Sequence, residues 1–345
     1  MDEITTPQPL CGKHCSEIIS QDRKSPDVLI LLGGMNWLGQ SMQASGLVDV
    51  AAIYKSRNKL TKPLFKLQYH MELLYHYRYI WYGNWKKYLE QYHTVILFDV
   101  FEDTDIIDYI QSNYPKIRII VYYYNPIYNQ YFLKKIGFTG VEIWSFDLCD
   151  CKKYRLKYNP QFYFRDINSL SSCSDCKSKN VKDYLYDIIF VGKDKGRSPL
   201  LMKLNKTFTN RGVQSFIRIC PDKESSYSKE YEQFFIKHIP YETYLEYLRQ
   251  SKCVLDIVQK AQQGLTLRIM EAIFFNKKIV TNNTAICGMK LYDKRNVYVI
   301  GVDNRDLIEF IKAPRYDWGE GIRNQYVFSE WLHRFFDSKS DIEGL

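Results

Sequence analysis

The sequence lacks an apolar run of the roughly 18 to 20 residues that are needed to span a bilayer. The polar stretch that begins at Met1 lacks the apolar core of a secretory signal, so we expect a cytoplasmic protein. The nine cysteines are an odd number, scattered through 345 residues. Without a secretory signal, a disulfide framework is not expected.

The spacing of the cysteines also does not favour a zinc site. Cys149 with Cys151 and Cys173 with Cys176 would supply four thiolates, but C-x-C combined with C-x₂-C across a loop is a weak match to structural zinc sites. Reduced thiols beside a linker are the favoured interpretation. We expect no metal and no other cofactor.

Nucleic-acid motifs are missing too, although the composition would suit such a partner. The net charge is +9, and aromatic residues reach 16% with 29 tyrosines, which favours nucleic acid, anionic lipid or a phosphorylated substrate. The chain has no zinc-finger spacing, RNP-like aromatic signature or basic heptad region, so no nucleic-acid partner is predicted. It also lacks G-x₄-G-K-[ST], which disfavours a P-loop NTPase.

The length predicts two domains, because single domains usually have about 100 to 200 residues. Residues 1–26 form a polar tail with three prolines, and residues 159–183 form a linker rich in Ser, Cys and Lys. Residues 27–158 and 184–315 are the two expected domains. Residues 316–345 are expected to carry a C-terminal helix that crosses back onto the first domain.

In the first domain, short apolar runs alternate with helical segments, which favours a parallel sheet covered on both faces. The expected strands are DVLILL, DVAAIY, TVILFD, KIRIIVYYY and GVEIWSF. Helices are expected from about Asn36, from about Pro63 to Gln91, and from about Thr104.

The same alternation restarts in the second domain, with the expected strands YDIIFVG, VQSFIRI, CVLDIV, KKIVT and NVYVIGV. Helices are expected at about 198–211, around 241–250, after Gly264 and at about 324–336. The predicted fold class is therefore α/β, with two Rossmann-like parallel-sheet domains facing each other across a cleft. Ligands of such sheets bind at the carboxyl ends of the strands.

The segment Gln263–Glu271, QGLTLRIME, is the most informative motif. Apolar residues at helical spacing predict a helix that starts near Gly264 and Thr266. Its N-terminus offers free N–H groups and a positive dipole end to an anion. Arg268 adds a cation suited to phosphate, and the carboxylate of Glu271 suits a ribose diol. This arrangement indicates a nucleotide-sugar site.

The run QGLTLRIMEA, with CVLDIV before it and KKIVTNN after it, resembles the donor-binding segment of GT-B-fold glycosyltransferases. In that family two Glu residues, separated by seven positions, span this loop and helix. Glu271 matches the second Glu, which contacts the nucleotide ribose, while Gln263 replaces the first. Because the first Glu contacts the donor sugar in many retaining members, the sugar and the stereochemical outcome stay open.

Two further stretches, YDIIFVGKDKGR and EIWSFDLCDCKKY, are similar to bacterial glycosyltransferases of surface-polysaccharide and lipopolysaccharide synthesis. The first places Gly192, Lys193, Lys195 and Arg197 between a strand and a helix. Glycine permits close backbone approach, and the cations would neutralise a diphosphate as it leaves. A solvated basic turn is the alternative interpretation.

The first domain is expected to supply the acceptor site and the catalytic base. Asp99 closes the strand TVILFD at its carboxyl edge, where a base would take the proton of an acceptor hydroxyl. An acid that caps a turn is an equally good explanation of Asp99. Gly34, in the loop after the first strand, is expected to face the donor phosphates, although a G-x-G-x-x-G motif is absent.

Two motifs are left with competing interpretations. Asp103-Thr104-Asp105 spells the D-x-D metal motif of GT-A enzymes, but so short a motif recurs by chance, and helix capping with the helix dipole is the favoured explanation. The segment from Lys62 to Gln91 interleaves Tyr and Trp with Lys and Arg, a composition that would suit contact with the inner face of the cytoplasmic membrane. Such residues more often cover a sheet and a neighbouring loop, which is the favoured interpretation.

Together these features predict a metal-independent glycosyltransferase that moves a sugar from a nucleotide-sugar donor to a glycan or lipid-linked glycan, in bacterial surface-polysaccharide synthesis. Two alternatives stay open: a nucleotide-sugar epimerase of the same fold, and a non-catalytic nucleotide-sugar-binding or scaffold protein.

Overall fold

The protein is described by a computed structural model that covers residues 27–56, 61–70, 78–99, 104–127, 140–165, 184–222, 229–237, 239–259 and 262–337, together with the single positions Leu133, Ile167 and Tyr227. The predicted tail at residues 1–26 and most of the predicted linker lie outside the described residues. So do Cys173, Cys176 and Asp103.

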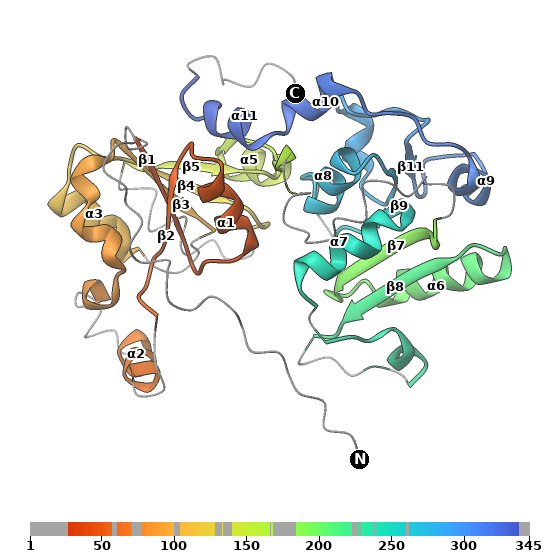
Figure 1. The fold of residues 1–345 in the computed structure, drawn as a ribbon, viewed down its shortest axis with the longest axis horizontal. Helices are drawn as coiled ribbons and strands as arrows, with labels where there is room; N and C mark the ends of the chain where they lie inside the picture. Colours follow the sequence, from red (N-terminus) through yellow and green to blue (C-terminus); the bar gives the residue numbers. More distant parts are fainter. Residues whose placement is uncertain are drawn as a thin grey trace.

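Two sheets, each made only of parallel strands, form the centre of the structure (Figure 1). The first has the order β2-β1-β3-β4-β5-β6 and the second the order β11-β10-β9-β7-β8. The predicted α/β class is confirmed. The strands of the first sheet are β1 (Val28–Leu32), β2 (Asp49–Ala52), β3 (Thr94–Phe98), β4 (Arg118–Tyr123), β5 (Glu142–Ser145) and β6 (Lys157–Tyr158). Those of the second are β7 (Tyr186–Lys193), β8 (Ser215–Cys220), β9 (Ser251–Asp256), β10 (Lys278–Thr281) and β11 (Val297–Val299).

Helices flank both sheets (Figure 1). The α-helices are α1 (Trp37–Ala44), α2 (Thr61–His70), α3 (Asp105–Asn113), α5 (Leu148–Tyr154), α6 (Ser198–Asn210), α7 (Tyr241–Arg249), α8 (Leu267–Phe274), α9 (Leu307–Lys312), α10 (Glu320–Gln325) and α11 (Phe328–His333). Short 3₁₀ helices are η2 (Asn84–Lys87), η3 (Leu89–Gln91), η6 (Lys229–Phe234) and η7 (Thr284–Gly288). Within the described ranges, no helix has the length and apolarity to cross a bilayer.

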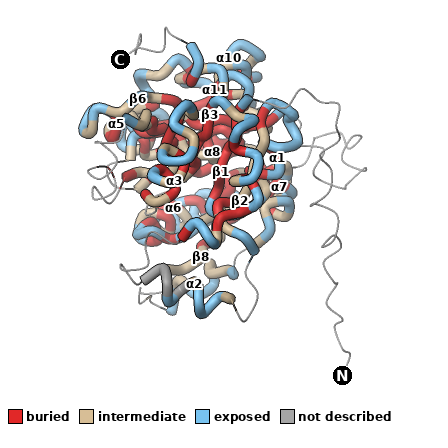
Figure 2. The backbone as a smooth tube through the Cα atoms, turned by 90° about the vertical axis from the view of Figure 1, so that its left-hand side faces the viewer, coloured by how far each residue is buried: buried red, intermediate tan, exposed pale blue. Residues whose placement is uncertain are grey.

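Alternation along the central strands divides the core into layers, because successive side chains of a strand point to opposite faces. In β1, Leu29 and Leu31 pack with one buried cluster, while Ile30 and Leu32 pack with another. Figure 2 shows buried segments, among them β1, β3 and α8, at the centre, with exposed segments around them. The cluster that holds Ile30 is continuous with side chains of the second sheet, such as Val254, so apolar packing joins the two sheets.

The C-terminal segment packs on the first sheet although it follows the second in sequence. The ring of Trp331 in α11 is fully buried and lies 5.0 Å from the ring of Tyr122 and 4.5 Å from that of Phe162. The guanidinium of Arg118 donates to the carbonyl oxygen of Phe335 at 2.7 Å. These contacts hold the C-terminal segment, which follows the second sheet in sequence, against the first sheet.

Two helix predictions need correction. The expected helix from Pro63 to Gln91 is not continuous: α2 ends at His70, and residues 78–91 contain only 3₁₀ turns. Gly83 lies so close to the Ala52 carbonyl that a Cβ there would be only 2.8 Å from its oxygen. The indole of Trp85 donates to the Ile53 carbonyl at 2.9 Å. These tertiary contacts with the end of β2 override the helical pattern.

The expected C-terminal helix is also divided, into α10 and α11. Its interruption at Tyr326 and Val327 has a structural cause. The Tyr163 N–H donates to the Tyr326 carbonyl at 2.7 Å, and the Phe328 N–H donates to the Tyr163 carbonyl at 2.9 Å. The segment pairs with Tyr163 as an isolated parallel bridge, which requires extended backbone at Val327.

Candidate functional site

A cavity of about 630 Å³ lies at the carboxyl ends of β7 and β8 and is lined on the other side by the start of α1. In each sheet the strand order reverses beside the first strand, and loops at such a reversal face a crevice where ligands bind. Side chains from both halves of the chain contribute to the lining. They are Asn36, Trp37, Gln40, Val191, Gly192, Lys193, Cys220, Ile236, Lys237, Ile239, Tyr241, Glu242, Tyr244, Leu267, Arg268 and Glu271.

Arg268, in the first turn of α8, is the most firmly held cation of this cavity. One guanidinium nitrogen donates to the Val191 carbonyl at 3.1 Å, and another lies 4.0 Å from a carboxylate oxygen of Asp256. The guanidinium also lies 4.7 Å from the ring centre of Phe190, within the range of a cation–π contact. A cation fixed in this way loses little side-chain entropy when it binds an anion.

Arg268 leaves no room for a side chain at position 192. A Cβ at Gly192 would stand 2.2 Å from a guanidinium nitrogen of Arg268, far inside van der Waals contact. The sequence predicts close approach of the Gly192 backbone to a ligand. The described structure adds a second reason, because the glycine makes room for the guanidinium beside the cavity.

Glu271, one turn further along α8, is only 2% exposed. Its two oxygens accept hydrogen bonds from the hydroxyls of Tyr241 at 2.8 Å and Tyr244 at 2.5 Å. Burial disfavours the charged carboxylate and raises its pKa to about 7, although both tyrosines and the nearby charge of Arg268 oppose the rise. Each oxygen keeps a second lone pair that a ligand hydroxyl can use.

An aromatic wall continues from Glu271 to the first half of the chain. The hydroxyl of Tyr163 lies 2.7 Å from that of Tyr241. Since Tyr241 donates to Glu271, Tyr163 donates to Tyr241. The ring of Tyr241 also stacks on Trp37, with 3.9 Å between ring centres and 9° between planes. Burial raises the pKa of Tyr241 and Tyr244 well above the usual value, so both hydroxyls stay protonated donors at neutral pH.

The basic residues of the turn after β7 lie in two different environments. Lys193 lines the cavity, and Lys195 is exposed beside it in a left-handed conformation with φ 47°. Arg197 is buried instead: its guanidinium donates to the carbonyls of Asp194 and Ile257 at 3.0 and 3.1 Å. Arg197 therefore ties this loop to the end of β9 and is not among the cavity-lining residues.

The backbone amides of Gln263 and Gly264, expected to hold a phosphate, already hold an anion from the protein itself. Both N–H groups donate to one oxygen of Asp147, at 2.8 and 2.7 Å. The other oxygen of Asp147 accepts from the N–H groups of Cys149 and Asp150 at the start of α5. This carboxylate, 1% exposed, thus binds four amides from both halves of the chain.

Thr266 has a structural contact rather than a cavity contact. As the residue before α8, it donates its hydroxyl to one oxygen of Asp256 at 2.7 Å, and Thr281 donates to the other at 3.0 Å. Asp256 is fully buried and also carries the ion pair with Arg268. Thr266 therefore helps to fix the carboxylate that positions Arg268.

Asp99 lies at the carboxyl end of β3 in a left-handed conformation with φ 58°. One of its oxygens accepts from the side-chain amide of Asn125 at 2.8 Å. Burial raises the pKa of Asp99 to about 6, although the Asn125 side chain, the backbone N–H groups of Tyr124 and Asn125, and the charge of Lys195 oppose that rise. Gly34 is exposed in the loop after β1, and neither it nor Asp99 lines the cavity.

No group of three or more His, Cys, Asp or Glu side chains suited to a metal ion occurs among the residues that the structure describes. Of the four cysteines with the weak zinc-like spacing only Cys149 and Cys151 are described, and the buried Cys151 thiol lies 3.4 Å from the Lys157 carbonyl oxygen. Of the D-x-D motif, Asp105 begins α3, and its carboxylate lies 3.6 Å from the buried guanidinium of Arg78.

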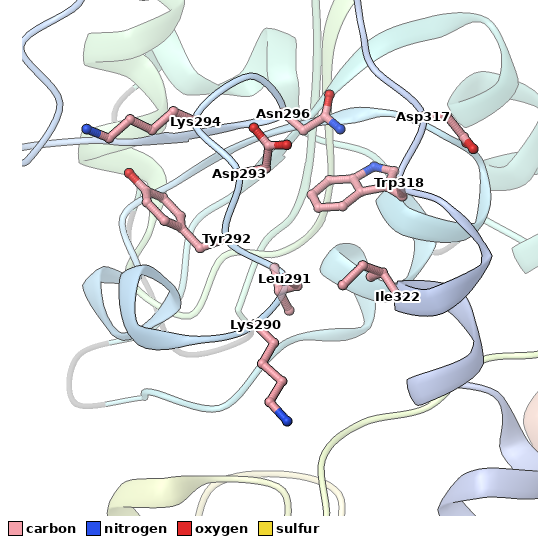
Figure 3. Close-up of a pocket in the computed structure, with 9 residues that line it drawn as sticks. All are labelled: Lys290, Leu291, Tyr292, Asp293, Lys294, Asn296, Asp317, Trp318 and Ile322. Carbon is pink, nitrogen blue, oxygen red and sulfur yellow. The ribbon is translucent and has the colours of Figure 1, made fainter. Parts of the chain in front are cut away.

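A second cavity, of about 370 Å³, lies on the second half of the chain (Figure 3). None of the predicted site residues lines it. The ammonium groups of Lys290 and Lys294 point away from it in Figure 3. The indole N–H of Trp318 donates to the Lys277 carbonyl at 2.9 Å. The cavity that Arg268 and Glu271 line is therefore the better candidate.

Sequence reasoning found four of the lining residues, Gly192, Lys193, Arg268 and Glu271, and missed Trp37, Tyr241 and Tyr244. The spacing of Tyr241 and Tyr244, three positions apart on a helix, was a usable signal, because such residues share a face. Asp147 closes the run that contains β5 just as Asp99 closes the run that contains β3, so the same argument would have found it. No protein-family model and no curated protein matches this chain.

Proposed function

We propose that the protein is a GT-B-like glycosyltransferase, with two Rossmann-like domains facing each other across a cleft. It transfers a sugar from a nucleotide-sugar to a glycan or lipid-linked glycan acceptor, as expected for bacterial surface-polysaccharide assembly. The observation that carries the proposal is the shared cavity, where the fixed guanidinium of Arg268, the carboxylate of Glu271 and the ammonium of Lys193 line one wall and α1 lines the other.

The diphosphate and the ribose of the donor would bind to different side chains of the cavity. Arg268 and Lys193, with Lys195 beside them, offer positive charge for a diphosphate. Glu271 and its two tyrosines offer acceptors and donors for a ribose diol. The amides of Gln263 and Gly264 are already bound by Asp147, so in this arrangement side chains rather than those amides neutralise the diphosphate.

Transfer needs a base for the acceptor hydroxyl, and Asp99 supports that role by its chemistry. Its raised pKa suits proton uptake near neutral pH. In an inverting reaction, the acceptor oxygen bonds to the anomeric carbon as its proton passes to Asp99. The bond between that carbon and the diphosphate breaks, and its electron pair leaves with the diphosphate, stabilised by the basic side chains. The resident groups supply this chemistry without a metal ion.

The proposal is tested by a thermal-shift screen with UDP-, GDP-, CMP- and dTDP-sugars, because a ligand that binds only the folded state raises apparent stability. Release of the nucleotide leaving group then follows with the best donor and a glycan acceptor mixture. Lys193→Ala, which removes an exposed cavity cation, is expected to weaken donor binding about tenfold.

The matched control is Lys203→Ala on the exposed face of α6, which should bind donor like the wild type. If the protein binds a nucleotide-sugar but turns over no combination of donor and acceptor, the transferase proposal is refuted and a binding protein is favoured. Conversion of the donor to an isomeric sugar without an acceptor would favour an epimerase.

A further inference from the structure

Most of the net charge of the protein is concentrated in one short stretch. Between Lys55 and Lys87 the sequence has eight Lys and Arg residues and one acid, Glu72, so this stretch carries +7 of the total of +9. A charge of one sign at this density creates a field that attracts anionic partners.

The same stretch carries large apolar side chains in solvent. The exposed fractions are 58% for Leu64, 60% for Leu67, 42% for Tyr79, 50% for Ile80 and 40% for Tyr88. These are five of the eleven large exposed apolar residues in the described part of the chain. Scattered exposed apolar side chains are ordinary, but a concentration of them marks an interaction surface.

Helix α2 is held so that its apolar side chains divide between the body and solvent. The ring of Phe65 packs on those of Tyr54 and Trp81, at 5.1 and 5.6 Å. Leu64 and Leu67, three positions apart, lie together on the outer face. Figure 1 shows α2 projecting away from the first sheet.

Lysines adjoin these apolar side chains. The ammonium of Lys55 donates to the Ile80 carbonyl at 3.3 Å, and that of Lys86 donates to the Tyr79 carbonyl at 2.9 Å. Burial lowers the pKa of Lys86, and the neighbouring charges of Lys55 and Lys87 add to this effect. Cations therefore lie beside the exposed apolar residues 79 and 80, and the contact of Phe65 with Trp81 places α2 next to this segment.

We propose that this region docks on an anionic phospholipid bilayer. We call it the α2 surface and define it by two groups of residues: the apolar Leu64, Leu67, Tyr79, Ile80 and Tyr88, and the basic Lys55, Lys62, Lys86 and Lys87. Leucine and isoleucine gain free energy by entering the acyl boundary, while lysines pair with lipid phosphates above it. A single-stranded nucleic acid fits less well, because its bases stack on aromatic side chains, and three of the five exposed apolar side chains of the α2 surface are aliphatic. This inference is independent of the chemistry proposed for the cavity.

Co-sedimentation of the full chain with vesicles tests the proposal. We expect binding to phosphatidylcholine vesicles containing 30% phosphatidylglycerol, weaker binding to pure phosphatidylcholine, and a marked loss in 0.5 M salt. The variant Leu64→Ser/Leu67→Ser should bind at least tenfold more weakly. Lys62→Gln/Lys87→Gln should lose roughly fivefold per lysine near the surface.

The chain offers matched controls away from the α2 surface. Leu185→Ser/Val302→Ser removes side chains that are 60% and 51% exposed, and Lys203→Gln/Lys206→Gln removes two exposed lysines of α6. Both controls should bind vesicles like the wild type, and all variants should keep the wild-type donor response in solution. Failure of the wild type to prefer anionic vesicles, or equal losses in test and control variants, would overturn the proposal. So would binding to single-stranded RNA that is stronger than vesicle binding and unaffected by Leu64→Ser/Leu67→Ser.

Discussion

The carboxylate of Asp147, at the start of α5, accepts the backbone N–H of Gly264, which precedes α8, at 2.7 Å. The two residues are 117 positions apart in sequence. The contact is close enough that a Cβ on Gly264 would stand 2.6 Å from the ring of Phe146. A single acid therefore joins the segment after β5 to the segment after β9.

Asp147→Ala should lower the free energy of unfolding by about 3 kcal/mol, since it leaves four amides without their acceptor, at least two of them in buried surroundings. Chemical denaturation measures this loss. Asp306→Ala is the control, because Asp306 caps α9 through two N–H groups of its own segment and otherwise makes an exposed ion pair with Arg211. A loss no larger for Asp147→Ala than for Asp306→Ala would show that the contact with Gln263 and Gly264 contributes nothing.

Gly192→Ala should displace the guanidinium of Arg268, because the new Cβ would stand 2.2 Å from its nitrogen. We expect a destabilisation of about 1 to 3 kcal/mol. Donor affinity should fall as far as in Arg268→Ala, which thermal titration with the donor measures. Gly321→Ala, in α10, where a Cβ would meet nothing within 4 Å, should not destabilise the protein and should keep the wild-type donor affinity. Wild-type donor affinity in Gly192→Ala would separate Gly192 from the function of Arg268.

Glu271→Gln should change how stability depends on pH. The folded protein raises the pKa of Glu271 from 4.5 to about 7, so it binds more protons than the unfolded chain between these values. The free energy of unfolding therefore falls as pH rises across this interval, by up to about 3 kcal/mol, and stays level above it.

The glutamine variant lacks this fall, so it should be more stable than the wild type at pH 8 and differ less at pH 4.5. Denaturation at a series of pH values measures the difference, with the exposed Glu246→Gln as the control that retains the fall. If the free energies of unfolding of the wild type and Glu271→Gln changed equally with pH, burial would not alter the ionisation of Glu271.

Asp99→Asn should lower turnover by about 10²- to 10⁴-fold if Asp99 is the base. Because only the ionised carboxylate accepts a proton, wild-type turnover should rise with pH through about 6, and the variant should lack this rise. Donor-induced thermal shift should stay at the wild-type value. Asp108→Asn, an exposed change on α3, is the control. An unchanged pH profile in Asp99→Asn would assign the base to another residue.

Local patterns predicted most elements of the two sheets. Runs such as TVILFD and CVLDIV are short, apolar and bounded by turn residues, so β3 and β9 formed where expected. The prediction was wrong where tertiary contacts compete with helical periodicity, as at Gly83 and Trp85, and at Val327. β6 was missed because two residues, Lys157 and Tyr158, carry no period.

The sequence by itself determined the α/β class and the gathering of Gly192, Lys193, Arg268 and Glu271 at one edge, because parallel strands bring their carboxyl ends together. Only the tertiary structure decided which anion the amides of Gln263 and Gly264 hold, and that Arg197 is buried. It also decided that Trp37 completes the cavity. These outcomes depend on where segments remote in sequence meet, and neither spacing nor composition specifies that meeting.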